Sequence, residues 1–168
     1  MVTSSGSTAN WNGKTFEAFV HDYLLRNGYS YIPRKNIETN DDTNQVLPTK
    51  KYLSEDKWFT SQFFLANTIY GTKWLVDFLI YDSNKDQYLV IECKWQQSGG
   101  SVDEKYPYLV TNIKQQSPYP CLVLLDGEGY KPAAKSWLIS QIDEKLINVL
   151  NMSEFLKWFR TQDLITID

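Results

Sequence analysis

Two apolar stretches of the chain carry charged residues at places where buried strands rarely have any. The stretches are 74–81 and 87–94, and the short segment between them is polar. Apolar, β-branched and aromatic runs joined in this way are typical of a β-hairpin. Asp77 lies in the first run, and Glu92 and Lys94 lie in the second. Because charged side chains are seldom buried unless they are paired or bind a metal ion, these three residues are the first candidates for chemistry.

The hairpin also predicts how the three charged side chains lie. Side chains alternate across a strand, so Glu92 and Lys94 share one face. With a turn centred on residues 84–85, Asp77 falls directly opposite Glu92. The Cβ atoms of opposed residues are about 5 Å apart, and two carboxylates at that spacing repel each other. A cation between them removes the repulsion, so the hairpin is predicted to be a metal site with a lysine beside it.

Other elements must hold this hairpin in place. A helix is predicted over 12–27, where apolar residues recur at helical spacing, and a strand is predicted over 58–70. The fully apolar run Cys121–Leu125 predicts a central strand with parallel neighbours. The polar segment 38–56 is predicted to be a loop or an insertion. The remaining predicted elements are a helix from Ser101 to Gln116 with a kink or a restart at Pro107, a helix over 132–143, a strand over 147–150 and a helix over 154–161 capped by Ser153.

The pattern Asp77-x14-Glu92-x-Lys94 on a hairpin resembles the PD-(D/E)XK nuclease superfamily. Val76 stands where the proline of the motif would be, at a position that varies in the superfamily. The resemblance extends over Trp11–Leu125, which is most of the chain. It implies a restriction-endonuclease-like α/β fold, with a central mixed four- to five-stranded β-sheet flanked by helices.

A second point of resemblance lies in the first predicted helix. Family members often begin with a helix that carries a glutamate of the metal site, and segment 13–20 looks like that helix, with Glu17 as the candidate. The macrodipole favours an acidic residue near a helix start in any case, so a purely structural role for Glu17 stays open. His21 lies one turn later on the same face of this helix. It is a candidate base or phosphate contact, or else an ordinary surface residue.

The resemblance implies a role for each residue of the hairpin. Asp77 and Glu92 would bind Mg²⁺, for which Mn²⁺ could substitute, because carboxylate oxygens suit hard divalent cations. The backbone carbonyl of Cys93 would complete this ligand set. Lys94 would orient or deprotonate the attacking water. Gln96, two residues further along the strand, would support the metal ligands without binding the metal itself.

Together these roles imply a metal-dependent DNA endonuclease of a restriction, mobile-element or repair type. One alternative is a non-catalytic module of the same fold that binds nucleic acid or protein, and another is a catalytic subunit that needs a recognition partner. In a third interpretation the charged residues form only a structural ion-pair cluster, because Glu92 and Lys94 can pair across two positions of one strand. That interpretation leaves Asp77 unexplained.

The charge of the chain is not that of a typical DNA-binding domain. Its formal net charge is −3 and its pI is near 5.2, whereas such domains are usually basic. Phosphate contacts depend on where the cations lie, however, and not on the total. The candidates for nucleic-acid contact are Lys50, Lys51 and Tyr52 in the polar segment, and Lys105 at the start of a helix.

Length and composition predict one globular domain over residues 11–168, preceded by a flexible lead over 1–10 that is rich in Ser, Thr and Gly. No apolar run approaches the ~20 residues that span a bilayer, so no membrane association is expected. Cys93 and Cys121 lie in predicted strands as reduced thiols, which suits a cytoplasmic protein. The aromatic stripe over 154–161 fits core packing or the face of a homodimer.

Overall fold

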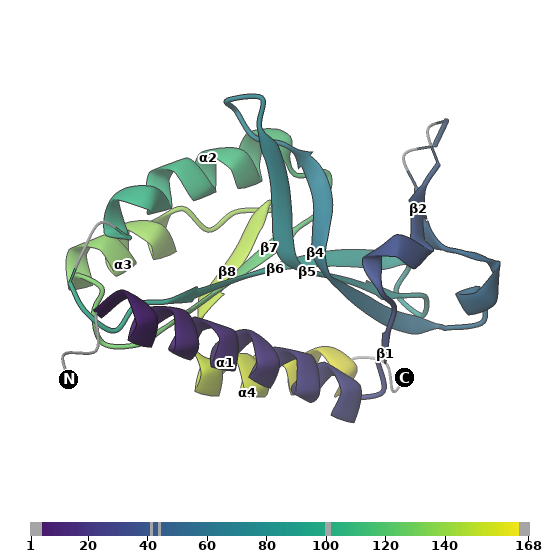
Figure 1. The fold of residues 1–168 in the computed structure, drawn as a ribbon, viewed down its shortest axis with the longest axis horizontal. Helices are drawn as coiled ribbons and strands as arrows, with labels where there is room; N and C mark the ends of the chain where they lie inside the picture. Colours follow the sequence, from purple (N-terminus) through teal and green to yellow (C-terminus); the bar gives the residue numbers. More distant parts are fainter. Residues whose placement is uncertain (1–4, 41, 44, 100–101, 165–168) are drawn as a thin grey trace.

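The computed structural model describes residues 5–40, 42–43, 45–99 and 102–164. In this part of the chain a mixed six-stranded sheet forms the middle layer, and helices cover both faces (Figure 1). In spatial order its strands are β1 (Ser30–Tyr31), β4 (Lys57–Asn67), β5 (Lys73–Asp82), β6 (Gln87–Trp95), β7 (Cys121–Asp126) and β8 (Leu146–Leu150). The predicted α/β fold is confirmed. The sheet exceeds the predicted four to five strands because the two-residue β1 joins its edge.

The helices are divided between the two faces of the sheet. They are α1 (Ser5–Arg26), α2 (Tyr106–Gln116), α3 (Pro132–Ser140) and α4 (Met152–Leu164). Figure 1 shows α1 and α4 on one face and α2 and α3 on the other. A smaller antiparallel sheet and three short 3-10 helices complete the described elements: β2 (Ile37–Thr39), β3 (Val46–Pro48), η1 (Arg34–Asn36), η2 (Lys50–Tyr52) and η3 (Asp103–Lys105).

A separate hydrophobic core lies on each face of the sheet. The core under α1 and α4 contains Phe16 and Phe155, and the core under α2 and α3 contains Ile113 and Leu138, all fully buried. Burial of each such side chain contributes roughly 1.5–3 kcal/mol. The aromatic stripe of α4 therefore packs in the core, because Phe159 is buried there beside Phe155.

Strand β7 is the most buried strand of the sheet. Residues Cys121–Leu125 are all 0–1% exposed, and β7 pairs in parallel with both β6 and β8. Leu122 and Leu124 contribute to one core, while Val123 and Leu125 contribute to the other. A strand that is buried on both faces needs an unbroken apolar run, and the prediction of a central parallel strand is confirmed.

The β5–β6 hairpin has the predicted register. Phe78 pairs with Ile91 and Asp82 pairs with Gln87, which is the pairing produced by a turn centred on residues 84–85. Continued by one step, this register would pair Asp77 with Glu92, but the ladder ends at Phe78 and the Asp77 carboxylate accepts from the backbone N–H of Cys93.

Strands β4 and β5 are both irregular at the level of Gln62 and Asp77. Their ladder continues on both sides but skips this pair. The φ angle of Gln62 is +52°, in a left-handed region that non-glycine residues rarely adopt. Trp58 and Phe63 belong to the same core although an odd spacing should place them on opposite faces. The inward-facing pattern therefore shifts by one residue at Gln62, beside Asp77.

Beyond this irregularity the β4–β5 hairpin rises from the sheet toward α2 (Figure 1). Its tip is attached to that helix, because the backbone N–H of Ile69 donates to Asn112 Oδ1 at 2.8 Å. The exposed ring of Tyr70 stacks on Tyr108 of α2 with centroids 5.0 Å apart. The helix thus supports the tip of the β4–β5 hairpin.

The structure corrects the predicted limits of several elements. Helix α1 begins at Ser5 and not at residue 12, so the second half of the predicted lead 1–10 is helical, while Met1–Ser4 lie outside the described residues. The segment 38–56 is not one loop. It contains part of the β2–β3 sheet, held by the buried side chain of Val46, and the short helix η2.

Two predicted helix starts also differ from those observed. Asn151, not Ser153, caps α4: its Oδ1 accepts from the backbone N–H of Glu154, and the Glu154 carboxylate accepts from the backbone N–H of Asn151, both at 2.8 Å. This reciprocal pair is a capping box. Of the kink or restart predicted at Pro107, the structure has the restart, because Pro107 lies in the first turn of α2. Ser101, the predicted cap of that helix, lies outside the described residues.

The loop after β7 packs tightly on the end of β6. Gln96 donates its backbone N–H to the carbonyl of Asp126 at 3.0 Å, and the N–H of Gly129 donates to the carbonyl of Gln96 at 2.8 Å. Gly127 has a φ of +96°, and a Cβ added there would lie 2.2 Å from the carbonyl oxygen of Gln96. Glycine is required at this position for both conformation and space.

We expect Gly127→Ala to lower the free energy of unfolding by about 3 kcal/mol, because strain and a backbone clash act together. The matched control is Gly71→Ala. Gly71 has a φ of +74° but nothing within 4 Å of an added Cβ, so only the strain of about 1–2 kcal/mol should appear. Urea unfolding midpoints measure both variants. Equal losses of unfolding free energy in the two variants would show that the loop moves away from the Cβ added by Gly127→Ala without further destabilisation.

Candidate metal and catalytic site

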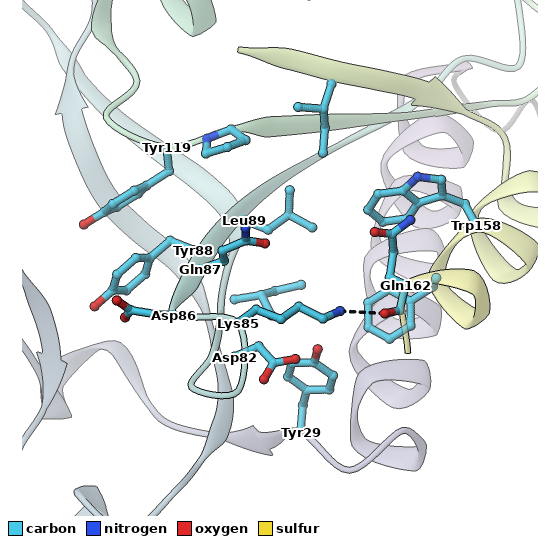
Figure 2. Close-up of a pocket in the computed structure, with 14 residues that line it drawn as sticks. Tyr29, Asp82, Lys85, Asp86, Gln87, Tyr88, Leu89, Tyr119, Trp158 and Gln162 are labelled. Carbon is cyan, nitrogen blue, oxygen red and sulfur yellow. Dashed lines mark hydrogen bonds between the residues drawn. The ribbon is translucent and has the colours of Figure 1, made fainter. Parts of the chain in front are cut away.

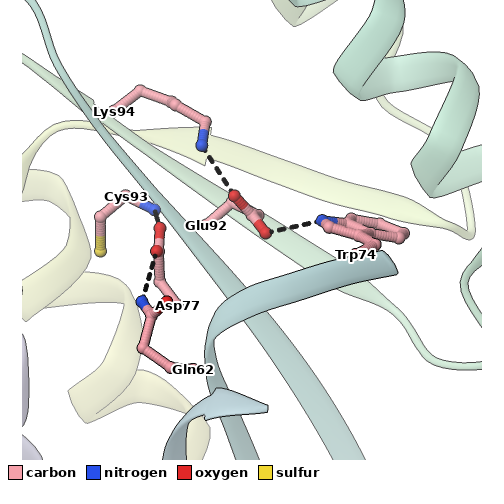
Figure 3. A network of polar contacts seen from close by, with 6 residues as sticks. All are labelled: Gln62, Trp74, Asp77, Glu92, Cys93 and Lys94. Carbon is pink, nitrogen blue, oxygen red and sulfur yellow. Dashed lines mark hydrogen bonds and ion pairs between the residues drawn. The ribbon is translucent and has the colours of Figure 1, made fainter. Parts of the chain in front are cut away.

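Asp77, Glu92 and Lys94 lie together at the end of the β5–β6 hairpin that is remote from its turn (Figure 3). Asp77 is partly exposed, and its carboxylate is held by two N–H groups. Its Oδ2 accepts from the backbone N–H of Cys93 at 2.7 Å, and its Oδ1 accepts from Gln62 Nε2 at 3.3 Å. The irregularity of β4 and β5 leaves Gln62 opposite Asp77 and makes this second bond possible.

Glu92 is the most deeply buried charged residue of the site. It is 3% exposed, and each carboxylate oxygen has a partner. Its Oε2 accepts from Lys94 Nζ at 2.7 Å, and its Oε1 accepts from the indole N–H of Trp74 at 3.1 Å (Figure 3). A buried carboxylate is tolerated only with such partners. Lys94, which is 30% exposed, connects this buried oxygen with the surface.

The ion pair between Glu92 and Lys94, on which the interpretation as a purely structural cluster depends, is thus present. Glu92 and Lys94 pair as neighbours on one face of β6. Asp77, which that interpretation left unexplained, finds its partners in Cys93 and Gln62. The geometry alone is therefore compatible with a structural cluster as well as with a reactive one.

The electrostatics of the cluster are dominated by negative charge. Burial raises the pKa of Glu92, and the nearby Asp77 raises it further, although Lys94 acts in the opposite sense. Burial by itself would lower the pKa of Lys94, but the carboxylates of Glu92 and Asp77 outweigh it and leave that pKa above its ordinary value. In this arrangement the ammonium group of Lys94 is suited to donate hydrogen bonds.

Glu17 belongs to the same electrostatic cluster. Burial raises its pKa most, the Asp77 carboxylate adds to the rise, and Lys94 opposes it. The buried ring of Phe16 packs edge-on against Trp95 at 5.8 Å, and this contact anchors α1 beside the end of β6. Glu17 therefore lies within electrostatic range of Asp77, Glu92 and Lys94.

His21, one turn after Glu17 on α1, is held by packing. Its ring lies 5.0 Å from the ring of Tyr31 and 5.1 Å from that of Phe59, between centroids. Its Nδ1 is 3.5 Å from Asp22. These contacts account for His21 as a residue that supports the edge of the sheet.

The side chain of Gln96 is held by two hydrogen bonds at the end of β6. The buried amide of Gln96 accepts from the hydroxyl of Tyr106 at 2.9 Å and donates to the carbonyl of Gly129 at 3.1 Å. No hydrogen bond in the described part of the chain joins Gln96 to the carboxylates, so it holds the end of β6 against α2.

The backbone N–H of Cys93 binds Asp77, burial raises the pKa of its thiol, and its carbonyl stays a predicted metal ligand. Both cysteines are free thiols.

The predicted nucleic-acid contacts lie apart from this cluster. Lys50 and Lys51 are exposed on η2, whereas Tyr52 is half-buried, with Lys51 Nζ 5.2 Å from the centre of its ring. Lys105 is exposed at the end of η3, next to Tyr106. Within the described ranges, no hydrogen bond or ion pair connects these four residues with the hairpin carboxylates.

Sequence reasoning missed two residues of the network. Gln62 is a polar residue inside an apolar strand, which is the same signal that pointed to Asp77. Trp74 gave a weaker signal, because a buried tryptophan usually needs an acceptor for its N–H, but only the folded hairpin shows that the acceptor is Glu92.

The donor set suits a hard divalent cation, since Glu17, Asp77 and Glu92 all offer carboxylate oxygens. The ligands are not yet gathered around one point. Among the described residues, no three His, Cys, Asp or Glu side chains are arranged to hold a metal ion as they stand. Asp77 and Glu92 instead accept hydrogen bonds from N–H and ammonium groups. Each of these carboxylate oxygens keeps a second lone pair for a cation, but the side chains would have to move closer together to share one ion.

A more enclosed pocket lies at the other end of the hairpin. It has a volume of about 490 Å³, and Asp82, Lys85, Tyr88 and Trp158 are among its lining residues (Figure 2). Lys85 Nζ donates across it to the carbonyl of Gln162 at 2.8 Å. None of the three hairpin charges lines this pocket. The carboxylate cluster is therefore separate from this pocket.

Comparison with known proteins gives one result. A family model described as a PD-(D/E)XK nuclease superfamily domain matches residues 8–162. No curated protein and no solved structure matches the chain significantly. Within the described residues, every helix is too short or too polar to cross a lipid bilayer. The match covers the hairpin, its supporting helices and the whole sheet, and on this basis the chain belongs to the PD-(D/E)XK nuclease superfamily.

Proposed function

We propose that the chain is a metal-dependent DNA endonuclease that hydrolyses phosphodiester bonds at the hairpin cluster. The observation that carries the proposal is that Asp77, Glu92 and Lys94 lie together at one end of the hairpin, with Glu17 of α1 near enough for their charges to shift its pKa. Carboxylates in excess over ammonium groups repel one another, and a cation relieves that repulsion. Membership of a nuclease superfamily supports the same chemistry.

Asp77 and Glu92 would hold Mg²⁺ or Mn²⁺, with Glu17 and the Cys93 carbonyl as further oxygen donors. When bound, such a cation polarises a phosphodiester and lowers the pKa of a coordinated water. The residues of the chain prepare this site. Gln62 orients the carboxylate of Asp77, and the indole of Trp74 fixes one oxygen of Glu92.

Lys94 has a separate part in the reaction. Its ammonium group pairs with Glu92 and is partly exposed, so it can also donate to a water molecule and to a phosphate oxygen. Negative charge on the phosphoryl oxygens grows in the transition state, and a fixed positive charge stabilises it. Lys94 would therefore position the attacking water and offset that charge.

A second candidate function is a non-catalytic module of the same fold that binds nucleic acid or protein. The observation in its favour is that all three hairpin charges already have protein partners. In that case the cluster would stabilise the sheet and bind no cation. The two candidates make opposite predictions for metal binding and for cleavage. In either case a homodimer or a separate recognition subunit could supply the selection of a DNA sequence.

Cleavage of supercoiled plasmid and linear duplex tests catalysis directly. We expect cutting with Mg²⁺ or Mn²⁺ but not with EDTA, and we expect Lys94→Ala to slow it at least about 100-fold, since it removes the charge at the phosphoryl group. Lys157→Ala, an exposed lysine on α4, is the matched control and should cut normally. Equal rates for the two variants would exclude the proposed role of Lys94. Absence of cutting by the wild-type protein, with either metal, would favour the binding module.

Thermal stability tests the metal site without any need for cleavage. Saturating Mg²⁺ or Mn²⁺ at 100 times Kd should stabilise the folded protein by about 2.7 kcal/mol, and so raise Tm by roughly 5–10 °C. Asp77→Asn should abolish this rise because it removes a ligand charge. Asp86→Asn, at the exposed turn of the same hairpin, should keep it. A wild-type Tm that does not change with either metal would contradict the metal site.

A further inference from the structure

We propose that an open groove beside Asp77 binds a backbone phosphate of the nucleic-acid strand, and that Gln62 links this phosphate contact to Asp77. The groove is lined by Tyr31, Pro33, Arg34, Lys35, Ser61 and Gln62. This inference rests on the proposed function, because it assigns a contact to the same substrate. The groove lies where η1 passes over β4, away from the loop that carries Lys50 and Lys51.

The chemistry of the groove is cationic. Arg34 and Lys35 are both exposed, and in the described part of the chain neither forms an ion pair with a carboxylate. On a chain with a net charge of −3, two adjacent cations without acidic partners mark a local positive site. Arginine binds phosphate through two parallel N–H bonds, and lysine adds a point charge. The hydroxyls of Tyr31 and Ser61, 3.3 Å apart, add neutral donors.

Arg34 is held in place by the backbone of β4. Its Nη1 donates to the carbonyl of Gln62 at 3.1 Å. A guanidinium has five N–H donors, so this bond orients the group and leaves most of its donors for another acceptor. Tyr31 supports the same wall, because its ring packs on His21 and Phe59. The groove is therefore built on the sheet and does not depend on a loop tip.

Gln62 connects the groove with the carboxylate cluster. Its carbonyl accepts from Arg34, and its side chain donates to Asp77 Oδ1. Both contacts depend on its φ of +52°, a conformation that costs a non-glycine residue free energy. One strained residue thus fixes the guanidinium relative to a candidate metal ligand. Gln62 is in this sense a positioning residue.

A strand of nucleic acid is the ligand that fits this arrangement. Phosphates recur along each strand at about 3.4 Å of helix axis. A strand that places one phosphodiester at the Asp77 carboxylate would bring a neighbouring phosphate to the groove on the other side of Gln62. The groove is open and carries the exposed cations Arg34 and Lys35, which suits an extended polyanion better than a small apolar molecule.

Equilibrium binding of a short fluorescein-labelled duplex, measured by anisotropy with Ca²⁺ and with EDTA over a range of salt, tests the groove. We expect Arg34→Ala/Lys35→Ala to lower affinity about tenfold or more and to reduce the salt slope by about 1–2, because one or two phosphate contacts are lost. The matched control is Lys50→Ala/Lys51→Ala, which removes two exposed lysines from η2. Its loss should be smaller.

The binding result is independent of catalysis. A wild-type protein that binds through the groove but does not cut would keep this inference while contradicting the nuclease. Equal affinities for the wild type and the Arg34/Lys35 variant would overturn the inference, as would an equal loss in the Lys50/Lys51 control. A wild-type protein that binds no duplex or single strand under either condition would overturn it as well.

The link through Gln62 has a separate test. Gln62→Gly keeps the backbone conformation, relieves its strain and removes the bond to Asp77. We expect kcat to fall about tenfold while KM and Tm are maintained, whereas the Arg34/Lys35 variant should raise KM. A purely structural role for Gln62 would instead lower Tm. Unchanged kcat in Gln62→Gly would exclude the link, and weaker duplex binding by this variant would assign Gln62 to the groove alone.

Discussion

The buried carboxylate of Glu92 is the constraint on which the rest of the site depends. A charge that is 3% exposed between strands needs partners. Lys94 provides one from the same face of β6, and Trp74 provides the other from β5. Each partner is itself held by a neighbouring strand, Trp74 by its pairing with Ala66 of β4 and Lys94 by its pairing with Leu125 of β7. The negative charge therefore determines which face of the hairpin holds the cluster and which residues must surround it.

The irregularity at Gln62 is the second requirement. If β4 and β5 alternated regularly through this point, Trp58 and Phe63 would face opposite sides of the sheet, and the two cores would not close as they do. The shift costs strain at one residue. The Gln62 carbonyl is then free of the ladder and accepts from Arg34, while the Gln62 side chain donates to Asp77. The same irregularity thus shapes the core and connects two parts of the surface.

The hairpin, its register and its charged residues could be predicted from sequence, because a charge inside an apolar run is a strong local signal and a turn determines the pairing. The central strand β7 could be predicted for a similar reason. The Gln62–Asp77 contact and the Arg34 groove could not, since they join segments distant in sequence through a backbone conformation that leaves no local pattern. The cap of α4 was misplaced by two residues because Asn151 and Ser153 are both good caps, and only the pairing with Glu154 distinguishes them.

The net negative charge of the chain can be reconciled with a polyanionic substrate once the charges are placed. Glu17, Asp77 and Glu92 account for part of the acidic excess, and they are concentrated where a divalent cation would reverse the local sign. Arg34 and Lys35 lie immediately beyond Gln62, where no acidic side chain of the described chain pairs with them. Screening limits the reach of surface charges to about 8–10 Å in physiological salt. A phosphate in the groove would therefore respond to these two cations and to the cluster across Gln62, and only weakly to the charge of the remaining surface.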